Sequence, residues 1–269
     1  MLKTIDLLEK AILASLEAGE AIMSVYKQAF EIEYKDDQSP LTEADLKANT
    51  IINRHLALTE IPVISEENKQ IDFSKRKHWN SCWVVDPVDG TKEFIKRNGE
   101  FTVNIALVRQ GQPICGVIYV PAEKTLYYAN VEENKAFKAE VDSHASSIDK
   151  VYALSKPLLP KETDTNSVQV VGSRSHMNED TLNFVDDLKS KGLQVEIVSK
   201  GSSLKFCLVA DGQADMYPRF APTWEWDTAA GQAICNAVGI DVISQETGEP
   251  LVYNKQNLLN PYFLVKPKE

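Results

Sequence analysis

Apolar residues recur at helical spacing over the first part of the chain. A long amphipathic helix is predicted from Thr4 to about Ala29. A second helical pattern runs from Thr42 to about Leu58, and the hydroxyl of Thr42 is a natural N-cap for it. The apolar residues on one face of the first helix are Ile5, Leu8, Ile12, Leu16, Ala21, Ile22 and Val25.

Short apolar runs bounded by charged or turn residues predict β-strands in the first half of the chain. Two of them, residues 61–64 and 82–85, predict buried strands that each deliver an acidic residue at the C-terminal end. The next four runs predict an antiparallel meander, because glycine and proline lie near the turns. These runs are residues 101–109, 114–120, 125–129 and 135–138.

Residues 143–166 are polar and contain proline, so a loop and a lobe boundary are expected there. Beyond them, strands alternate with helices, which predicts an α/β second lobe. We therefore divide the chain into an α+β lobe, residues 1–150, and an α/β lobe, residues 151–269. The expected strands are 168–171, 194–199, 214–217, a run near 240 and 262–265, and the expected helices are 178–191, 202–210 and 227–238.

The composition is that of a globular protein: 269 residues, 43% hydrophobic and 25% charged, with a net charge of −10. This acidic balance argues against binding to a nucleic-acid polymer, which needs a clustered basic face. An anionic small substrate would need positive charge close to its binding site, and metal ions held by carboxylates can supply that charge. The four cysteines form no CxxC pair, and neither a signal peptide nor a membrane span is evident, so a cytoplasmic protein with reduced thiols is expected.

The segment 83–91 carries the strongest chemical signal. Here an apolar strand runs into a tight turn that bears Asp86 and Asp89, and the carbonyl of Val88 can add a further oxygen. Hard cations such as Mg²⁺ prefer oxygen ligands, but the glycine spacing excludes an EF-hand. The alternative is a solvated Asp-Gly turn. A buried strand directly before the turn makes this alternative the poorer explanation of the two aspartates.

Three other acidic positions are ambiguous when taken alone. Glu66 and Glu67 follow a predicted strand and can reach the same sheet edge as Asp86, or they are exposed loop residues. Asp227 precedes a predicted helix, where aspartate is also a preferred N-cap. Asp45 lies three residues after Thr42, close to a capping-box arrangement.

Four segments together resemble the inositol monophosphatase superfamily in content and order, and the DPxDGT and WDxAA signatures are highly specific. They are residues 39–45 (SPLTEAD), 64–67 (ISEE), 83–91 (WVVDPVDGT) and 224–231 (WEWDTAAG). The resemblance implies a layered αβαβα sandwich, the inositol-monophosphatase-like sugar phosphatase fold, with the site between two lobes. Three further segments are similar to the 3'(2'),5'-bisphosphate nucleotidases of the CysQ type: residues 172–176 (GSRSH), 201–205 (GSSLK) and 217–219 (YPR).

The resemblance implies a site with two Mg²⁺ ions, or three as the alternative. Glu67, Asp86 and the Val88 carbonyl would hold the first ion. Asp86, Asp89 and Asp227 would hold the second, and a weaker third ion would lie near Glu67 and Asp45. The choice of Glu67 over Glu66 rests on the alignment of one motif.

The same resemblance assigns catalytic and substrate-binding residues. Thr91 would orient a metal-bound water for in-line attack on phosphorus, and Asp45 would take its proton through the Thr91 hydroxyl. The backbone N–H groups of Gly90 and Thr91 would hold the scissile phosphate. The remaining substrate-binding residues would be His176 near the adenine, and Ser203, Lys205 and Arg219 near the second phosphate.

The implied activity is Mg²⁺-dependent hydrolysis of adenosine 3',5'-bisphosphate to AMP and phosphate, with 3'-phosphoadenylyl sulfate as a second substrate. An inositol monophosphatase or sugar-bisphosphate phosphatase of the same superfamily is the nearest alternative. A non-catalytic, metal-dependent sensor is the alternative from another class, which a hydroxyl at Thr91 argues against. We expect a small-molecule nucleotide substrate, a monomer with a dimer as the alternative, and a cytoplasmic location with peripheral binding to the inner membrane as the alternative.

Overall fold

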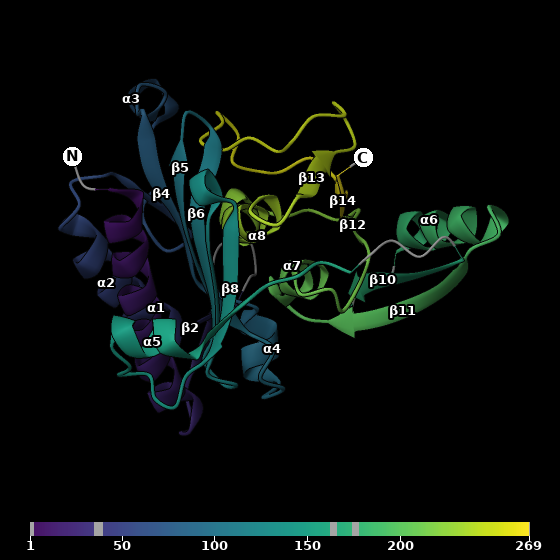
Figure 1. The fold of residues 1–269 in the computed structure, drawn as a ribbon. Coiled ribbons are helices and arrows are strands. Elements are labelled where there is room, and N and C mark those ends of the chain that lie inside the picture. The colour runs from purple at the N-terminus through teal and green to yellow at the C-terminus, as the bar shows by residue number, and fades with distance from the viewer. Residues whose placement is uncertain (1–2, 35–39, 162–165, 174–177, 269) are drawn as a thin grey trace.

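A seven-stranded sheet forms the centre of the molecule (Figure 1). The computed structural model describes residues 3–34, 40–161, 166–173 and 178–268. Neighbouring strands follow the chain order, and all pairs are antiparallel except the parallel first pair, so the predicted meander is confirmed. The strands are β3 (Val63–Ser65), β4 (Ser81–Asp89), β5 (Thr102–Arg109), β6 (Gln112–Val120), β7 (Thr125–Asn130), β8 (Lys135–Glu140) and β9 (Ser155–Pro157).

Two long helices cover one face of this sheet, and both were predicted. Helix α1 (Thr4–Tyr26) packs against α2 (Glu43–Ala57) and against β5 and β6, while α2 also contacts β4. Successive side chains of a strand point to opposite faces of the sheet, so β4 contributes residues to two apolar clusters. Trp83 and Val85 lie in the cluster beneath α1 and α2, whereas Cys82 and Val84 belong to the cluster on the opposite face.

Helix α8 (Glu225–Asn236) covers that opposite face with very little free space around it. A Cβ atom on Gly116 of β6 would lie 2.7 Å from the Ala230 carbonyl oxygen. On the other side, a Cβ atom on Gly231 would lie 2.4 Å from the ring of Phe206 in α7 (Leu204–Ala210). Glycine at both positions lets α8 fit between the sheet and α7.

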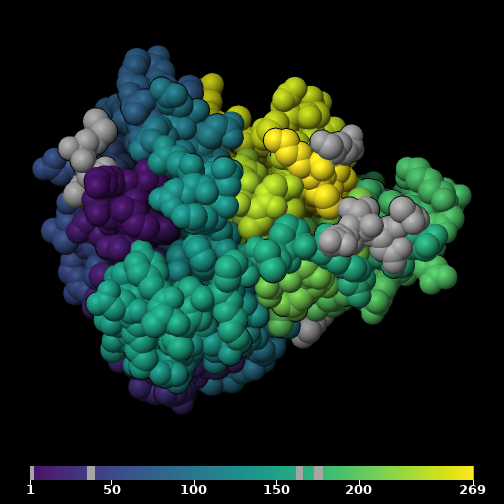
Figure 2. All heavy atoms as spheres, viewed as in Figure 1, coloured from purple at the N-terminus to yellow at the C-terminus, as the bar shows by residue number. Residues whose placement is uncertain are grey.

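The rest of the C-terminal part adds a second strand layer and an outer helix. Strands β12 (Tyr217–Arg219), β14 (Phe263–Pro267) and β13 (Ile240–Ser244) form an antiparallel sheet in that order. The parallel pair β10 (Ser167–Ser173) and β11 (Gln194–Lys200) is joined to it by a bridge, and α6 (Glu179–Ser190) packs on this pair. Helix α6 and strands β10 and β11 project from the main body (Figures 1 and 2). The layers confirm the predicted αβαβα sandwich, with helices on both sides of a mixed sheet.

The prediction of a loop over residues 143–166 is wrong in part. Helix α5 (Ile148–Leu154) lies inside it and packs on α1 and β8, and β9 then pairs with β8. The first sheet therefore continues to Pro157. The division of the chain near residue 150 stays a prediction, although α5 spans that position.

The remaining elements are short. Strands β1 (Ile32–Tyr34) and β2 (Pro40–Thr42) pair in antiparallel fashion just before α2. All four cysteines are buried and free, as expected for reduced thiols. Among the described residues, no helix is long and apolar enough to cross a membrane. The other short elements are α3 (Phe73–Arg76), α4 (Thr91–Ile95) and the 3₁₀ turn η1 (Val131–Glu133).

Candidate active site

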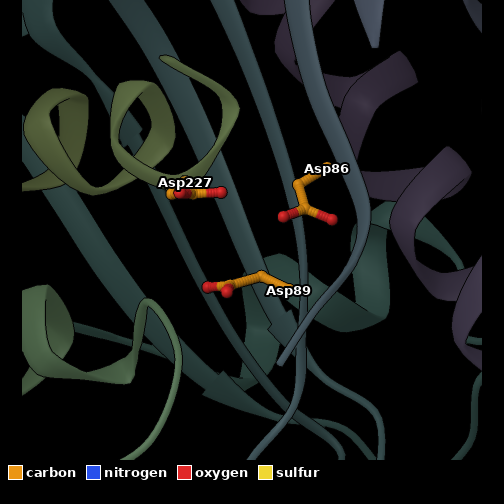
Figure 3. A group of neighbouring side chains, drawn as sticks. All are labelled: Asp86, Asp89 and Asp227. Atoms are coloured by element: carbon orange, nitrogen blue, oxygen red, sulfur yellow. The ribbon is translucent and has the colours of Figure 1, made fainter. Parts of the chain in front are cut away.

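Three aspartates converge where β4 ends and α8 begins (Figure 3). Asp86 and Asp89 lie on β4, Asp227 lies in the first turn of α8, and one carboxylate oxygen from each lies within 4.8 Å of the others. The carboxylates of the three side chains point into one shared space. The structure therefore brings together the three aspartates that were expected to lie close to one another.

An irregularity in β4 explains how Asp86 and Asp89 reach the same space. Residues three apart in a regular strand point to opposite faces. Here Asp86 pairs with Asn104 of β5 and Asp89 pairs with Thr102, so three steps along β4 match two along β5. This extra residue is a β-bulge, which re-aims the side chain that follows it. The turn expected at residues 86–89 is thus a bulged strand, and the turn itself comes at Gly90.

Each aspartate is held through one carboxylate oxygen by a backbone N–H. The three pairs are Val88 with Asp86 (3.0 Å), Ser203 with Asp89 (2.6 Å) and Trp224 with Asp227 (2.8 Å). Each bond fixes the orientation of its side chain while the other carboxylate oxygen stays available to a ligand. This arrangement is suited to a cation that lies between the three side chains.

The local charges favour the same conclusion. Burial raises the pKa of Asp86 well above its usual value, and the negative charges of Glu66, Asp89, Asp227 and Asp45 raise it further. The pKa of Asp227 is raised in the same way, first by burial and then by Asp89 and Glu66. Ionised carboxylates this close together repel one another unless a positive charge lies between them. An all-oxygen donor set of this kind fits a hard divalent cation.

The structure places Glu66, and not Glu67, on the wall of this cavity. Glu66 lines the same cavity as Asp86 and Asp227, and its charge acts on both carboxylates. Glu67 does not line that cavity, although its backbone N–H lies 3.4 Å from the Ser65 hydroxyl. Both residues lie in the turn that follows β3, and only Glu66 lies on the cavity wall. Glu66 is therefore the better-placed candidate ligand, and the choice between Glu66 and Glu67 stays a prediction.

Asp45 and Thr91 form the pair that the resemblance implied. The Thr91 hydroxyl lies 3.3 Å from Asp45 Oδ1 and 3.3 Å from the Val88 carbonyl oxygen. The other oxygen of Asp45 accepts hydrogen bonds from the backbone N–H of Thr42 (2.8 Å) and from its hydroxyl (2.7 Å). Asp45 is thus both the capping-box residue of α2 and the hydrogen-bond partner of Thr91.

Gly90 links the acidic cavity to a loop from the second half of the chain. Its φ of 92° lies in the left-handed region, which favours glycine, and it precedes α4. A Cβ atom at this position would lie 2.0 Å from the Ser202 hydroxyl oxygen. Glycine at residue 90 therefore allows residues 201–203 to approach the end of β4.

A second, smaller cavity adjoins the acidic one and adds basic side chains to the site. The two have volumes of about 150 Å³ and about 300 Å³. The smaller is lined by Lys205, Arg219 and Tyr217, and the Lys205 ammonium lies 5.5 Å from the Tyr217 ring. The residues common to both cavities are Asp89, Gly90, Lys92, Glu93 and Asp227.

Lys205 and Arg219, two of the cations that line the smaller cavity, have unusual surroundings. Burial, and then the charge of Arg219, lower the pKa of Lys205 to about 8. The Lys205 ammonium donates to the Ser202 carbonyl at 2.6 Å. The Nε of Arg219 is buried and has no hydrogen-bond partner among the described residues. A buried lysine beside a half-buried arginine is suited to a polyanionic group such as phosphate.

Ser203 occupies a different place from the one expected. It lines the smaller cavity, but its hydroxyl lies 2.6 Å from Asp89 Oδ2 and 2.8 Å from the Asp227 carbonyl oxygen. The side-chain amide of Asn104 donates to the Ser203 hydroxyl at 2.8 Å. The expected role of Ser203 in binding substrate phosphate therefore stays a prediction, and its contacts in the structure are with the aspartates.

Asn104 was missed by the sequence analysis, and His176 falls outside the described residues. Asn104 is 1% exposed and also lies 3.3 Å from Asp89 Oδ2. A signal for it existed, because it is a polar residue within the apolar run 102–109 of a predicted strand. Buried polar side chains need partners, so such a residue at the centre of a strand indicates a buried network.

Comparisons with known proteins agree with the geometry. The inositol monophosphatase family model matches residues 5–264. The 3'(2'),5'-bisphosphate nucleotidase CysQ of Salmonella typhimurium is 46% identical over 264 residues, covering 96% of this chain and 99% of that protein. The protein of the same name from Escherichia coli K12 is 45% identical, covering 92% and 94%.

Solved structures show the same fold. The crystal structure of CysQ from Bacteroides thetaiotaomicron, described as a bacterial member of the inositol monophosphatase family, matches with a TM-score of 0.89 at 47% identity, covering 100% of both chains. The suhB protein of Bartonella henselae matches in fold alone, with a TM-score of 0.72 at 22% identity and coverage of 96% and 92%. The layered sandwich and the oxygen-lined acidic cavity define an enzyme of the metal-dependent type. The chain belongs to the inositol monophosphatase family.

Proposed function

We propose that the protein is a Mg²⁺-dependent 3'(2'),5'-bisphosphate nucleotidase that hydrolyses adenosine 3',5'-bisphosphate to AMP and phosphate. The names of the curated relatives support this activity. We also propose 3'-phosphoadenylyl sulfate as a substrate, giving adenylyl sulfate, because it carries the same 3'-phosphate. A monomeric, cytoplasmic enzyme is part of the proposal.

The observation that carries the proposal is the pairing of an acidic cavity with a basic one. A bisphosphate presents two anionic groups, one to be cleaved and one to be held. The acidic cavity around Asp86, Asp89 and Asp227 fits the first group together with its cations. The adjoining cavity, with Lys205 and Arg219, fits the second. A substrate with a single phosphate would leave Lys205 and Arg219 without a phosphate partner.

In this proposal the acidic side chains hold two Mg²⁺ ions, with three as the alternative. Glu66, Asp86 and the Val88 carbonyl form one set of donors, and Asp86, Asp89 and Asp227 form the other. Divalent cations bound there would neutralise the phosphate oxygens and make a nearby water more acidic. Magnesium is proposed because all the donors are oxygens.

The chain's own residues then orient the water and accept its proton. The Thr91 hydroxyl donates to Asp45 Oδ1 (3.3 Å), so it can receive a proton from a water molecule and pass its own to the carboxylate. Positioned general-base catalysis of this kind contributes about 10²- to 10⁴-fold. The backbone N–H groups of Gly90 and Thr91, where α4 begins, can hold the scissile phosphate.

The experiment that tests the proposal measures phosphate release from three substrates with Mg²⁺ and with chelator. The substrates are adenosine 3',5'-bisphosphate, inositol 1-phosphate and fructose 1,6-bisphosphate. We expect strong, Mg²⁺-dependent preference for the nucleotide. Faster hydrolysis of the inositol or sugar phosphate would assign the chain to another branch of the family, and turnover of none of the three would favour a sensor.

A further inference from the structure

Ser203 is held entirely by the groups around the candidate cation site. It is 2% exposed, and its backbone N–H and its hydroxyl both lie 2.6 Å from Oδ2 of Asp89. The hydroxyl also lies 2.8 Å from the backbone carbonyl of Asp227 and accepts a hydrogen bond from Asn104. One serine thus contacts the side chain of one candidate ligand and the backbone of another.

The hydrogen-bonding capacity of a hydroxyl limits what else Ser203 can do. A serine hydroxyl donates one proton and accepts through two lone pairs. Asn104 fills one lone pair, and the single proton goes to Asp89 or to the Asp227 carbonyl. Since no proton remains for a substrate phosphate, the hydroxyl of Ser203 is engaged by the protein before any ligand arrives.

The contacts also determine which oxygen of Asp89 meets a cation. Oδ2 receives the backbone N–H of Ser203, and the Ser203 hydroxyl lies 2.6 Å and the Asn104 amide 3.3 Å from it. An oxygen with these neighbours has little capacity for a metal ion, whereas Oδ1 is held by no donor among the described residues. Hydrogen bonds of this kind orient metal ligands in proteins and are worth about ten- to a hundred-fold in metal affinity.

We propose that Ser203, supported by Asn104, is a positioning residue that makes Asp89 a one-oxygen ligand and ties the start of α7 to the cation site. The inference rests on the proposed function only in assuming that the aspartates bind a divalent cation. Lys205 lies two residues further along, at the start of α7. The same contact therefore sets the position of the phosphate-binding cavity relative to the cations.

The test measures cation binding without substrate, by titrating Mg²⁺ and Mn²⁺ into the full chain in a calorimeter. Ser203→Ala removes the hydroxyl and keeps the backbone N–H, and we expect cation affinity to fall about ten- to a hundred-fold. Ser203→Thr keeps a hydroxyl and should recover much of this loss. Ser15→Ala is the matched control, because Ser15 is equally buried but donates to the Ile12 carbonyl within α1.

Melting temperatures of all variants separate positioning from a general loss of structure. A folded Ser203→Ala protein with unchanged cation affinity and a raised KM for the nucleotide would overturn the proposal and return Ser203 to substrate binding. Equal losses of affinity in Ser203→Ala and Ser203→Thr would also overturn it. Because no substrate is used in the titration, failure of the nucleotidase assignment would leave this measurement unaffected.

Discussion

The acidic half of the site, around Asp86, Asp89 and Asp227, and the basic half, around Lys205 and Arg219, differ in chemistry but share one property. In the acidic half, three aspartates are fixed by backbone N–H groups and repel one another. In the basic half, burial lowers the pKa of Lys205 to about 8, and Arg219 Nε lacks a partner among the described residues. Each half is electrostatically unfavourable without a ligand, and each is relieved by a ligand of opposite sign. The unfavourable electrostatic free energy of bringing like charges together is part of folding, and binding a cation or a phosphate offsets it.

The strongest way to break this comparison is to remove the proton-accepting pair while keeping the three converging aspartates and Lys205. Asp45→Asn or Thr91→Val should lower kcat by up to about 10⁴-fold, because the water loses its general base. Cation affinity and the KM should change little. Thr50→Val is a control on α2, since the Thr50 hydroxyl donates to the Leu46 carbonyl within the helix. Near-normal kcat in both site variants would reject the assigned base.

Asp86→Asn tests the acidic half. Removing a carboxylate at its centre should lower turnover about 10³-fold, since metal ions contribute several kcal/mol to catalysis. The same change should stabilise the cation-free protein by about 1 kcal/mol, or roughly 2–4 °C in melting temperature, because a repelling charge is lost. The folded-state pKa of Asp86 is raised above 3.8, so the stability gain should grow as the pH rises above about 4. A variant less stable than the parent in chelator would contradict the repulsion.

Lys205→Met tests the basic half. Loss of a charge-assisted hydrogen bond to the second phosphate should raise the KM for adenosine 3',5'-bisphosphate about ten- to a hundred-fold. The KM for 3'-AMP, which lacks that phosphate, should change little. Lys200→Met is the matched control, because Lys200 lies five residues earlier and is 3.7 Å from Glu100.

The same lysine predicts a pH dependence. The pKa of Lys205 is about 8, so its charge is present below this pH and is lost above it. We expect kcat/KM for the bisphosphate to decline as the pH rises through about 8, and the decline to vanish in Lys205→Met. A parent profile that stays flat to pH 9 would show that Lys205 does not carry the second phosphate.

The smallest expected effect separates two neighbouring glutamates. Glu66→Gln should weaken cation binding about ten-fold, because its side chain lies at the cavity with Asp86 and Asp227. Glu67→Gln should leave cation affinity unchanged. Both are measured by titration with Mg²⁺, and a larger loss in Glu67→Gln would restore the ligand first inferred from the motif.

Local patterns were sufficient to predict most of the fold. The helical periodicity gave α1 and α2, and the four apolar runs gave the meander from β5 to β8. Helix α5 was missed because its seven residues are flanked by polar segments, and the pairing of β9 with β8 is a contact that no local pattern contains. Periodicity needs more residues than such short elements provide.

The candidate site was predictable in its residue types and less so in its geometry. Asp86, Asp89 and Asp227 could be identified from motifs, but the bulge that brings the first two together depends on pairing with β5. The preference for Glu66 depends on side-chain direction beyond β3. The contacts of Ser203 join residues more than 20 positions apart, so they could not be inferred from spacing.

The close fit of α8 has a consequence for how this enzyme can change during evolution. Gly116 and Gly231 leave little room on either side of the helix, so a larger residue at either position would displace the Ala230 backbone or the Phe206 side chain. By contrast, Arg219 lies on β12, and the outer strands β10 and β11 lie further from the central sheet. Selection for a new leaving group can therefore alter the outer layers while the cation-binding helix stays in place.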